Sequence, residues 1–247
     1  MFNVQKLIDK SIETNYQFKG DLRDNEKFHV SDSGTCYRKR FYKRLGIVPT
    51  GKIDTKSLRK MVAGDAGHEK IQWLLNRYGN LFASEGELET EHIKGHFDGV
   101  VKNGKEKSLL EIKTIEKWSM GYIKKDGPKN EHVLQLFTYW WLLRQDYLNL
   151  DQAVLSYIKR EDFETHDFYY KWNKKLVTKV LKEWKPLVAY WKKKKLPPCT
   201  CDEDYGGNGV KYCRYKTKSG KRCCSKALFT NYLKREEKEN GTKEKTD

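Results

Sequence analysis

Two extended segments joined by a tight turn constrain the fold of this chain more than any other feature. The residues of 93–101 and 108–114 are typical of strands, and the turn-forming pair Asn103-Gly104 lies between them. The sequence therefore predicts a β-hairpin. Such a hairpin also fixes which side chains share a face, because successive residues of a strand point to opposite sides.

The second strand of this hairpin carries a carboxylate and an ammonium group on one face. Glu111 and Lys113 are two residues apart and so point to the same side, and Asp98 on the first strand is placed to approach them. Two carboxylates can hold a divalent metal ion beside a cation, which is what hydrolysis of a phosphodiester requires. The alternative is an ordinary surface ion pair between Glu111 and Lys113.

Helical patterns and further strands surround the hairpin. Apolar residues recur at helical spacing over 4–12, 31–45, 58–78, 132–147, 173–195 and 225–234, and two more strands are expected over 153–159 and 165–172. The order helix, strands, helix, strands, helix predicts an α/β core with helices on both faces of the sheet.

The charge of the chain indicates a polyanionic partner. Fifty Lys and Arg residues against 34 Asp and Glu leave a formal net charge of +16, which favours nucleic acid, with anionic lipid as the alternative. No apolar run approaches the roughly 18 residues of a membrane span, and the first residues are too polar for a secretory signal. We therefore expect a cytoplasmic protein that does not enter a membrane.

The six cysteines are unevenly distributed. Cys36 stands alone, and the other five crowd into the last quarter of the chain: Cys199, Cys201, Cys213, Cys223 and Cys224. Without an export signal, this crowding favours metal ligands over disulfides. One alternative is a zinc site made wholly from the last five, with Cys36 as a buried thiol.

Four motifs in order resemble one nuclease superfamily. They are Gly64-Asp65-Ala66-Gly67-His68, the strand with Asp98, the strand with Glu111-Ile112-Lys113, and Gln135 four residues before Tyr139. Over about 31–224 the chain resembles the PD-(D/E)XK superfamily, and within it the RecB-like exonucleases, which include the AddB nuclease domain and the CRISPR-associated iron–sulfur exonucleases. The resemblance implies a restriction-endonuclease-like core, a mixed central sheet flanked by helices, with an N-terminal helical region and a C-terminal Cys-rich metal segment.

The resemblance also implies a metal site. His68, Asp98 and Glu111 would bind the ion together with the carbonyl of Ile112. An imidazole beside two carboxylates favours a borderline ion, so we expect Mn²⁺ to support activity at least as well as Mg²⁺.

Three further residues receive roles from the resemblance. Lys113 would activate or position water, and Gln135 and Tyr139 would support Lys113 or the DNA phosphate. Gln135 and Tyr139 are one helical turn apart and so share a helix face. The expected catalytic set is Asp98, Glu111, Lys113, Gln135 and Tyr139.

The cysteine layout resembles that of the iron–sulfur members. The preferred ligand set for a [4Fe–4S] cluster is Cys36, Cys201, Cys213 and Cys224. The spacing of this chain departs from the family pattern, so the choice between Cys199 and Cys201, and between Cys223 and Cys224, stays open.

Basic residues with aromatic neighbours are expected to hold the substrate. Cations that follow phosphates and rings that stack on bases suit a single strand or a frayed end. An alternative is that the aromatic residues belong to the core. The predicted DNA-binding residues are Arg38, Lys39, Arg40, Lys117, Lys124 and Lys125.

These patterns together predict a metal-dependent DNA exonuclease, with a site-specific endonuclease less favoured. We expect a nuclease domain over 1–198, a Cys-rich cluster-binding segment over 199–235 and a disordered charged tail over 236–247. The expected partners are DNA and proteins of helicase, integration or phage recombination systems, in a bacterial, archaeal or viral setting. A non-catalytic nucleic-acid-binding or assembly subunit with the same fold is the alternative.

Overall fold

The computed structural model describes residues 3–17, 25–146, 148–201, 213–215 and 226–243. The chain divides into two compact units, which we describe separately. The sheet unit comprises Met1–Gln17, Lys27–Gly34 and Asp54–Pro186. The cysteine unit comprises Phe18–Glu26, Thr35–Ile53 and Leu187–Asp247.

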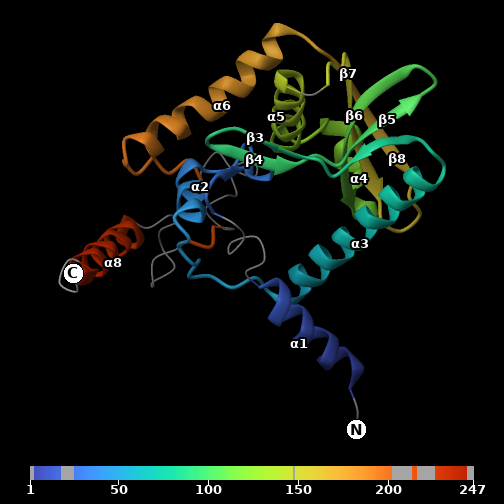
Figure 1. Cartoon of the computed structure of the whole chain (residues 1–247). Coiled ribbons are helices and arrows are strands. Elements are labelled where there is room, and N and C mark those ends of the chain that lie inside the picture. Colours follow the sequence, from blue (N-terminus) through green and yellow to red (C-terminus); the bar gives the residue numbers. More distant parts are fainter. Residues whose placement is uncertain (1–2, 18–24, 147, 202–212, 216–225, 244–247) are drawn as a thin grey trace. The chain divides into compact units, whose positions relative to one another are not determined.

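A five-stranded mixed sheet forms the centre of the sheet unit (Figure 1). Its strands, in spatial order, are β2 (Leu81–Ser84), β5 (Gly99–Asn103), β6 (Glu106–Ile115), β7 (Gln152–Lys159) and β8 (Thr165–Lys171). The pair β6 and β7 is parallel and the other neighbours are antiparallel. The predicted α/β fold with a mixed sheet is thus confirmed.

Helices cover the two faces of this sheet. The helix α3 (Thr55–Arg77) packs Ile71 against Leu110 and Ile112, on one face of β6. The helix α5 (Asn130–Asp146) lies on the other face, where Lys113 of β6 contacts it. Between β6 and α5 the chain forms α4 (Lys117–Asp126), a helix that the sequence patterns did not predict.

The predicted strand over 93–101 is wrong in one respect, because the structure divides it. The first part, β4 (Ile93–His96), belongs to a second sheet between β1 (Phe28–His29) and β3 (Glu87–Glu89), and the second part is β5. The chain bends at Phe97, whose ring is buried against Gly86, where a Cβ atom would lie 2.4 Å from it. The bend sends the chain from one sheet into the other.

The remaining helices differ from the predicted ranges mainly at their ends. The predicted helix over 31–45 is a single 3-10 turn, η1 (Val30–Asp32), and then α2 (Tyr37–Arg44), because Gly34 has a φ of +73° that interrupts a helix. The others are α1 (Val4–Tyr16), α6 (Lys174–Lys192) and α8 (Lys226–Lys243). The helix α8 therefore extends into the range expected to be a disordered tail, and 244–247 lie outside the described residues.

The cysteine unit is built around buried cysteines and tyrosines. Cys36, Cys201 and Cys213 are buried with Tyr42 and Tyr215, whose ring centroids are 5.3 Å apart. This unit therefore has an apolar core of its own, made largely of sulfur and aromatic side chains.

The described part of the chain contains no helix with both the length and the apolar composition needed to cross a lipid bilayer.

Candidate active site

The strand β6 places Glu111 and Lys113 together on the face that α5 covers. Glu111 is almost fully buried, with 1% of its surface exposed, and the Nζ atom of Lys113 lies 2.7 Å from its Oε1 atom. Lys113 keeps 21% of its side chain exposed. The pair thus joins a buried carboxylate to a cation that still reaches solvent.

Asp98 joins this pair from the end of the neighbouring strand. It directly precedes β5, where the pairing of β5 with β6 ends at Gly99 and Leu110. Beyond that point the amide of Ile112 has no partner on β5 and donates instead to the Oδ2 atom of Asp98, at 2.6 Å. The divergence of the two strands therefore turns the Asp98 carboxylate toward β6.

The helix α3 adds His68 to the site. Its Nε2 atom lies 3.2 Å from Oδ2 of Asp98, and one turn later Gln72 donates from Nε2 to the carbonyl of Asp98 at 2.9 Å. Gln72 was not among the predicted residues, although its spacing of four from His68 places both on one helix face. Two contacts from one helix thus fix the position of Asp98.

Two glycines allow α3 to approach β6 closely. A Cβ atom on Gly64 would lie 3.4 Å from Oγ1 of Thr114, and one on Gly67 would lie 3.3 Å from its Cγ2 atom. The hydroxyl of Thr114 also donates to the carbonyl of Gly64 at 3.2 Å. The glycines of this motif therefore have a packing role, which brings His68 to the strand that carries Glu111.

The carboxylate of Glu111 has the character of a metal ligand. Both of its oxygens are buried and neither accepts an aligned hydrogen bond from the described residues, since the contact with Lys113 is an ion pair. Such atoms are costly to bury without a partner, and a divalent cation would supply one. The ligand atoms of His68, Asp98 and Glu111 do not all fall within 4.8 Å of one another, so a shared ion would draw them slightly together.

The charged groups of the site shift one another's pKa values. Burial, and then the charge of Asp98, raise the pKa of Glu111 to about 7, although Lys113 opposes the shift. Burial would lower the pKa of Lys113, but Glu111 and Asp98 outweigh it and raise this pKa. In the same way, burial is outweighed by Asp98 at His68, and the pKa of the imidazole is raised. Burial affects Glu111 more than Lys113, because the lysine side chain remains in contact with solvent.

The two predicted residues of α5 have different surroundings. Gln135 is buried, and its Oε1 atom accepts a hydrogen bond from Nζ of Lys113 at 2.9 Å. Tyr139 is also buried and lies against β4, where a Cβ atom on Gly95 would come within 2.9 Å of its hydroxyl. The structure thus joins Gln135 to Lys113 and packs Tyr139 next to the second sheet.

Comparison of the whole chain with known proteins shows what this arrangement resembles. No protein-family model and no curated protein sequence matches the chain significantly. The crystal structure of SSO0001 matches with a TM-score of 0.52 and 18% identity, covering 88% of this chain and 99% of that chain. The crystal structure of LHK-Exo in complex with dAMP matches with a TM-score of 0.51 and 15% identity, covering 72% and 92%. The chain shares its fold with these two structures.

LHK-Exo is an alkaline exonuclease from Laribacter hongkongensis. At these identities the likeness concerns the fold alone. The fold brings the four motifs of this chain together, because residues from α3, from the start of β5, from β6 and from α5 meet at one place.

The predicted DNA-binding residues fall into two groups. Lys117, Lys124 and Lys125 are exposed on α4 of the sheet unit, and Lys124 forms an ion pair with Glu164 at 3.0 Å. The second group, Arg38, Lys39 and Arg40, begins α2 in the cysteine unit.

The second group is less available to a ligand than the sequence suggested. Arg40 is buried, with 2% of its surface exposed, and its guanidinium lies 4.8 Å from the ring centroid of Tyr37. Arg38 donates from Nε to the carbonyl of Pro197 at 2.9 Å. The predicted contact between Arg40 and DNA therefore has no support in the structure.

Three cysteines meet in the cysteine unit. The Sγ atoms of Cys36, Cys199 and Cys201 all lie within 4.8 Å of one another, and the amide of Thr200 donates to the sulfur of Cys36 at 3.3 Å. Cys213 is buried in the same cluster. Of the predicted ligands, Cys36, Cys201 and Cys213 are thus brought together, Cys199 lies beside them, and Cys223 and Cys224 lie outside the described residues.

A half-buried histidine and a buried tyrosine next to Lys113 were not predicted from the sequence. Tyr157 of β7 is the register partner of Lys113, and its hydroxyl lies 2.8 Å from Nδ1 of His132 on α5. The amide of Lys129 also donates to this hydroxyl, at 3.0 Å. Burial, and then the charge of Lys113, lower the pKa of His132 to about 2, so its imidazole is neutral.

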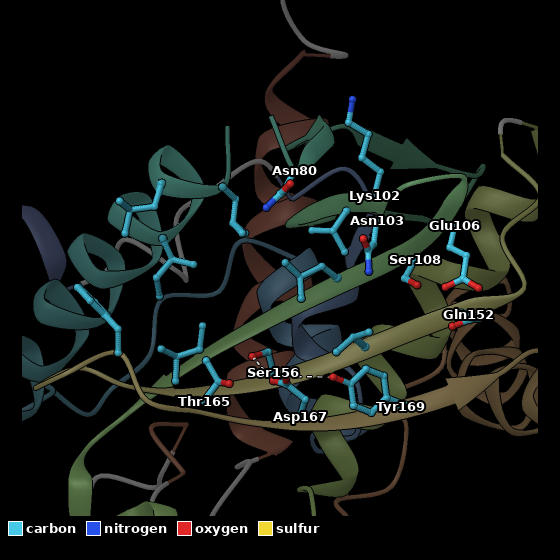
Figure 2. A pocket seen from close by; sticks show the side chains of 18 residues that line it. Asn80, Lys102, Asn103, Glu106, Ser108, Gln152, Ser156, Thr165, Asp167 and Tyr169 are labelled. Atoms are coloured by element: carbon cyan, nitrogen blue, oxygen red, sulfur yellow. Dashed lines mark hydrogen bonds between the residues drawn. The ribbon is translucent and has the colours of Figure 1, made fainter. Parts of the chain in front are cut away.

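A large pocket lies on the opposite face of the sheet. It has a volume of about 710 Å³, and Leu110 of β6 lines it together with residues of α3 and β8 (Figure 2). Asp167 accepts hydrogen bonds there from Ser156 at 2.6 Å and from Tyr169 at 3.3 Å. Since Leu110 and Glu111 point to opposite faces, this pocket is separate from the candidate active site.

Proposed function

We propose that the chain is a divalent-metal-dependent deoxyribonuclease whose active site is formed by Asp98, Glu111 and Lys113. The observation that carries this proposal is the buried carboxylate of Glu111, which lies beside a second carboxylate and a lysine. Apart from the ion pair between its Oε1 atom and Lys113, its two buried oxygens accept no aligned hydrogen bond from the described residues. A metal ion would coordinate these oxygens. In a purely structural buried ion pair, hydrogen bonds would be expected to satisfy the remaining lone pairs.

His68, Asp98 and Glu111 would hold the ion, with the carbonyl of Ile112 as a further ligand. When bound, Mn²⁺ or Mg²⁺ would lower the pKa of a water molecule and offset the charge of the phosphate. The buried carboxylate oxygens of Glu111 and the imidazole nitrogen of His68 are a set of ligand atoms that suits Mn²⁺ as well as Mg²⁺.

Lys113 acts as a cation in this proposal. Its raised pKa keeps the ammonium protonated, so it donates hydrogen bonds and does not accept a proton. Gln135 accepts a hydrogen bond from one N–H of the ammonium and Glu111 lies against another, which leaves the third N–H for a phosphate oxygen or the attacking water. Lys113 therefore orients the nucleophile and stabilises the charge that develops on the phosphate.

Attack from DNA ends is the mode of action that we favour. LHK-Exo is an alkaline exonuclease, and its structure holds dAMP, a DNA mononucleotide. The fold similarity to it supports exonuclease activity over endonuclease activity. Single-stranded or frayed ends are the proposed substrate, in recombination, repair, replication or CRISPR and phage DNA processing.

The cysteine cluster is proposed to hold a structural metal group. Cys36, Cys201 and Cys213 supply buried sulfurs, Cys199 supplies a half-buried one, and an amide hydrogen bond to the sulfur of Cys36 is a usual feature of metal thiolates. A [4Fe–4S] cluster is the preferred group and zinc the alternative. Either would join α2 to the segment after α6.

Degradation of end-labelled DNA tests the proposal. Linear and circular DNA, single- and double-stranded, are incubated with Mn²⁺, Mg²⁺ or EDTA and with wild type, Lys113→Ala or Lys107→Ala. Lys107 is the matched control, because it is a lysine of the same strand that contacts the ring of Phe82. We expect metal-dependent loss of linear DNA in wild type and control only, with circles spared. Binding without cleavage would instead identify a non-catalytic DNA-binding subunit.

A further inference from the structure

The helix α4 displays two aromatic rings to solvent. Trp118 is 65% exposed and Tyr122 is 61% exposed, and their ring centroids lie 6.0 Å apart in an edge-to-face arrangement. The helix buries its other side through Met120 and Ile123. The exposed rings therefore do not belong to the core, although large exposed aromatic side chains tend to promote aggregation.

The indole of Trp118 is held in place without being covered. Its Nε1 atom donates to Glu116 at 2.6 Å, and Glu116 is itself held by Lys60 at 3.0 Å. No cation of the described chain lies over the Trp118 ring, whereas the 50% exposed Trp73 on α3 has Nζ of Lys70 at 3.8 Å from its centroid. The face of Trp118 is thus both rigid and free to receive another ring.

A glycine opens the helix surface between these rings and the neighbouring lysines. A Cβ atom on Gly121 would meet nothing within 4 Å, so the packing of the chain does not require glycine here. Glycine in a helix nevertheless costs about 1 kcal/mol relative to alanine. Lys117 and Lys125 are four residues away on either side and are exposed, so the open position lies between two cations. A backbone that approaches closely, such as that of a nucleic acid, would account for the glycine.

The position of α4 relates this surface to the candidate active site. Trp118 follows Lys113 by five residues, which limits the distance between their Cα atoms to about 18 Å, at 3.6 Å per residue. A strand of nucleic acid advances by about 3.4 Å per phosphate. A strand of roughly five nucleotides would therefore reach from the active site to the rings.

We propose that the exposed face of α4 is a platform for single-stranded DNA, on which bases stack against Trp118 and Tyr122 while Lys117 and Lys125 contact the phosphates. The faces of bases are accessible in single strands and frayed ends and are covered in a duplex. The platform would thus give the enzyme its preference for single strands. This inference rests on the proposed DNA substrate.

Binding of a fluorescent oligothymidylate tests the platform. The assay uses the full chain in EDTA at one fixed salt concentration, so that no hydrolysis occurs. Trp118→Ala is expected to weaken binding about 5- to 100-fold, the loss of one stacked base, while Trp118→Phe stays within about threefold of wild type. Binding of a blunt duplex should change much less. Trp73→Ala is the matched control, because Trp73 is a 50% exposed tryptophan beside a lysine on another helix, and it should bind as wild type does.

Two further variants separate stacking from folding and from simple charge. Gly121→Gln should melt at or above the wild-type temperature, since its side chain extends into open space, but should bind the oligonucleotide several times more weakly. Lys125→Ala should reduce the slope of log affinity against log salt by about 0.7.

The platform is contradicted if Trp118→Ala binds as wild type does, if it loses duplex binding equally, or if Trp73→Ala weakens binding as much. A change in sedimentation of Trp118→Ala in the absence of DNA would also contradict it, because the surface would then join two copies of the chain. If DNA binding depends on Trp118 but the protein does not cleave DNA, the platform is supported and the nuclease proposal is contradicted. If the protein cleaves DNA but neither binding nor cleavage changes in Trp118→Ala, the nuclease proposal is supported and the platform is contradicted.

Discussion

The Nζ atom of Lys113 donates a hydrogen bond to Oε1 of Gln135 across 2.9 Å, which ties the central strand β6 to the helix α5. Because the same ammonium lies 2.7 Å from Glu111, the lysine is fixed from two sides. Its direction is thus set by the sheet and by the helix together. The contact also gives the buried amide of Gln135 a hydrogen-bond partner.

Removal of this contact should slow cleavage without unfolding the protein. In Gln135→Ala, Lys113 keeps its charge but loses an orienting partner, and we expect kcat to fall roughly 10- to 100-fold. Gln145→Ala is the control, because Gln145 is an exposed glutamine of the same helix that contacts only the carbonyl of Trp141 among the described residues. Single-turnover cleavage rates measure the effect. Equal rates for both variants would show that Gln135 does not position Lys113.

The close approach of α3 to β6 predicts a sensitivity at Gly67. In Gly67→Val the new side chain would meet Thr114, since its Cβ atom alone would lie 3.3 Å from Cγ2. We expect a loss of about 1–3 kcal/mol in the free energy of unfolding and a larger loss of activity, because His68 moves with the helix. Ala66→Val, at the exposed neighbouring position, should cost about 0.5 kcal/mol. Urea unfolding of the two variants gives the comparison, and similar losses would contradict the packing role.

The neutral histidine beside Tyr157 predicts how stability depends on pH. In the unfolded chain His132 takes up a proton below about pH 6.5, whereas the folded pKa of about 2 keeps it neutral. The unfolded state therefore binds more protons between these values, and stability falls as the pH is lowered through this window. The cost is at most about 1.4 kcal/mol per pH unit.

The glutamine variant of His132 isolates this effect. His132→Gln can still bond to Tyr157 but cannot be protonated, so its stability should fall less steeply from pH 6.5 to pH 4. His96→Gln removes a histidine with a 63% exposed side chain and should follow wild type. Chemical denaturation at several pH values measures the slopes. A slope in His132→Gln equal to that of wild type would rule out His132 as the cause.

The sulfur cluster predicts that Cys36 is needed for a bound metal group, despite its distance in sequence from the other cysteines. Cys36→Ala should lose iron or zinc and melt at a lower temperature, since two parts of the cysteine unit lose their link. Thr200→Ala is the control, because Thr200 contacts the cluster through its backbone amide. Metal analysis after anaerobic purification measures the content. Full metal content in Cys36→Ala would restrict the site to the C-terminal cysteines.

The periodicity of the strand and the order of the motifs were enough to predict the central residues of the site. The alternation along β6 placed Glu111 and Lys113 on one face, and the family resemblance placed Gln135 toward them. These relations are local, so they can be inferred from spacing along the chain.

The rest of the site depends on contacts between distant segments. Gln72 meets the carbonyl of Asp98 only because α3 packs on the sheet, and Tyr157 meets His132 only because α5 lies against β7. The bend at Phe97 depends likewise on Gly86. No periodicity along the sequence contains this information, so the missed residues are those fixed by tertiary packing.

The most direct test of the metal site is to measure Mn²⁺ binding and DNA cleavage on the same samples of wild type, Glu111→Gln and Glu106→Gln. Glu106 is an exposed glutamate of the same strand, and its variant should behave as wild type does. Free Mn²⁺ is read from its electron paramagnetic resonance signal, and cleavage from an end-labelled single strand. We expect Glu111→Gln to lose the tight Mn²⁺ site and to cleave roughly a hundred- to a thousandfold more slowly. Undiminished Mn²⁺ binding and cleavage in Glu111→Gln would contradict the assignment of this carboxylate as the centre of the active site.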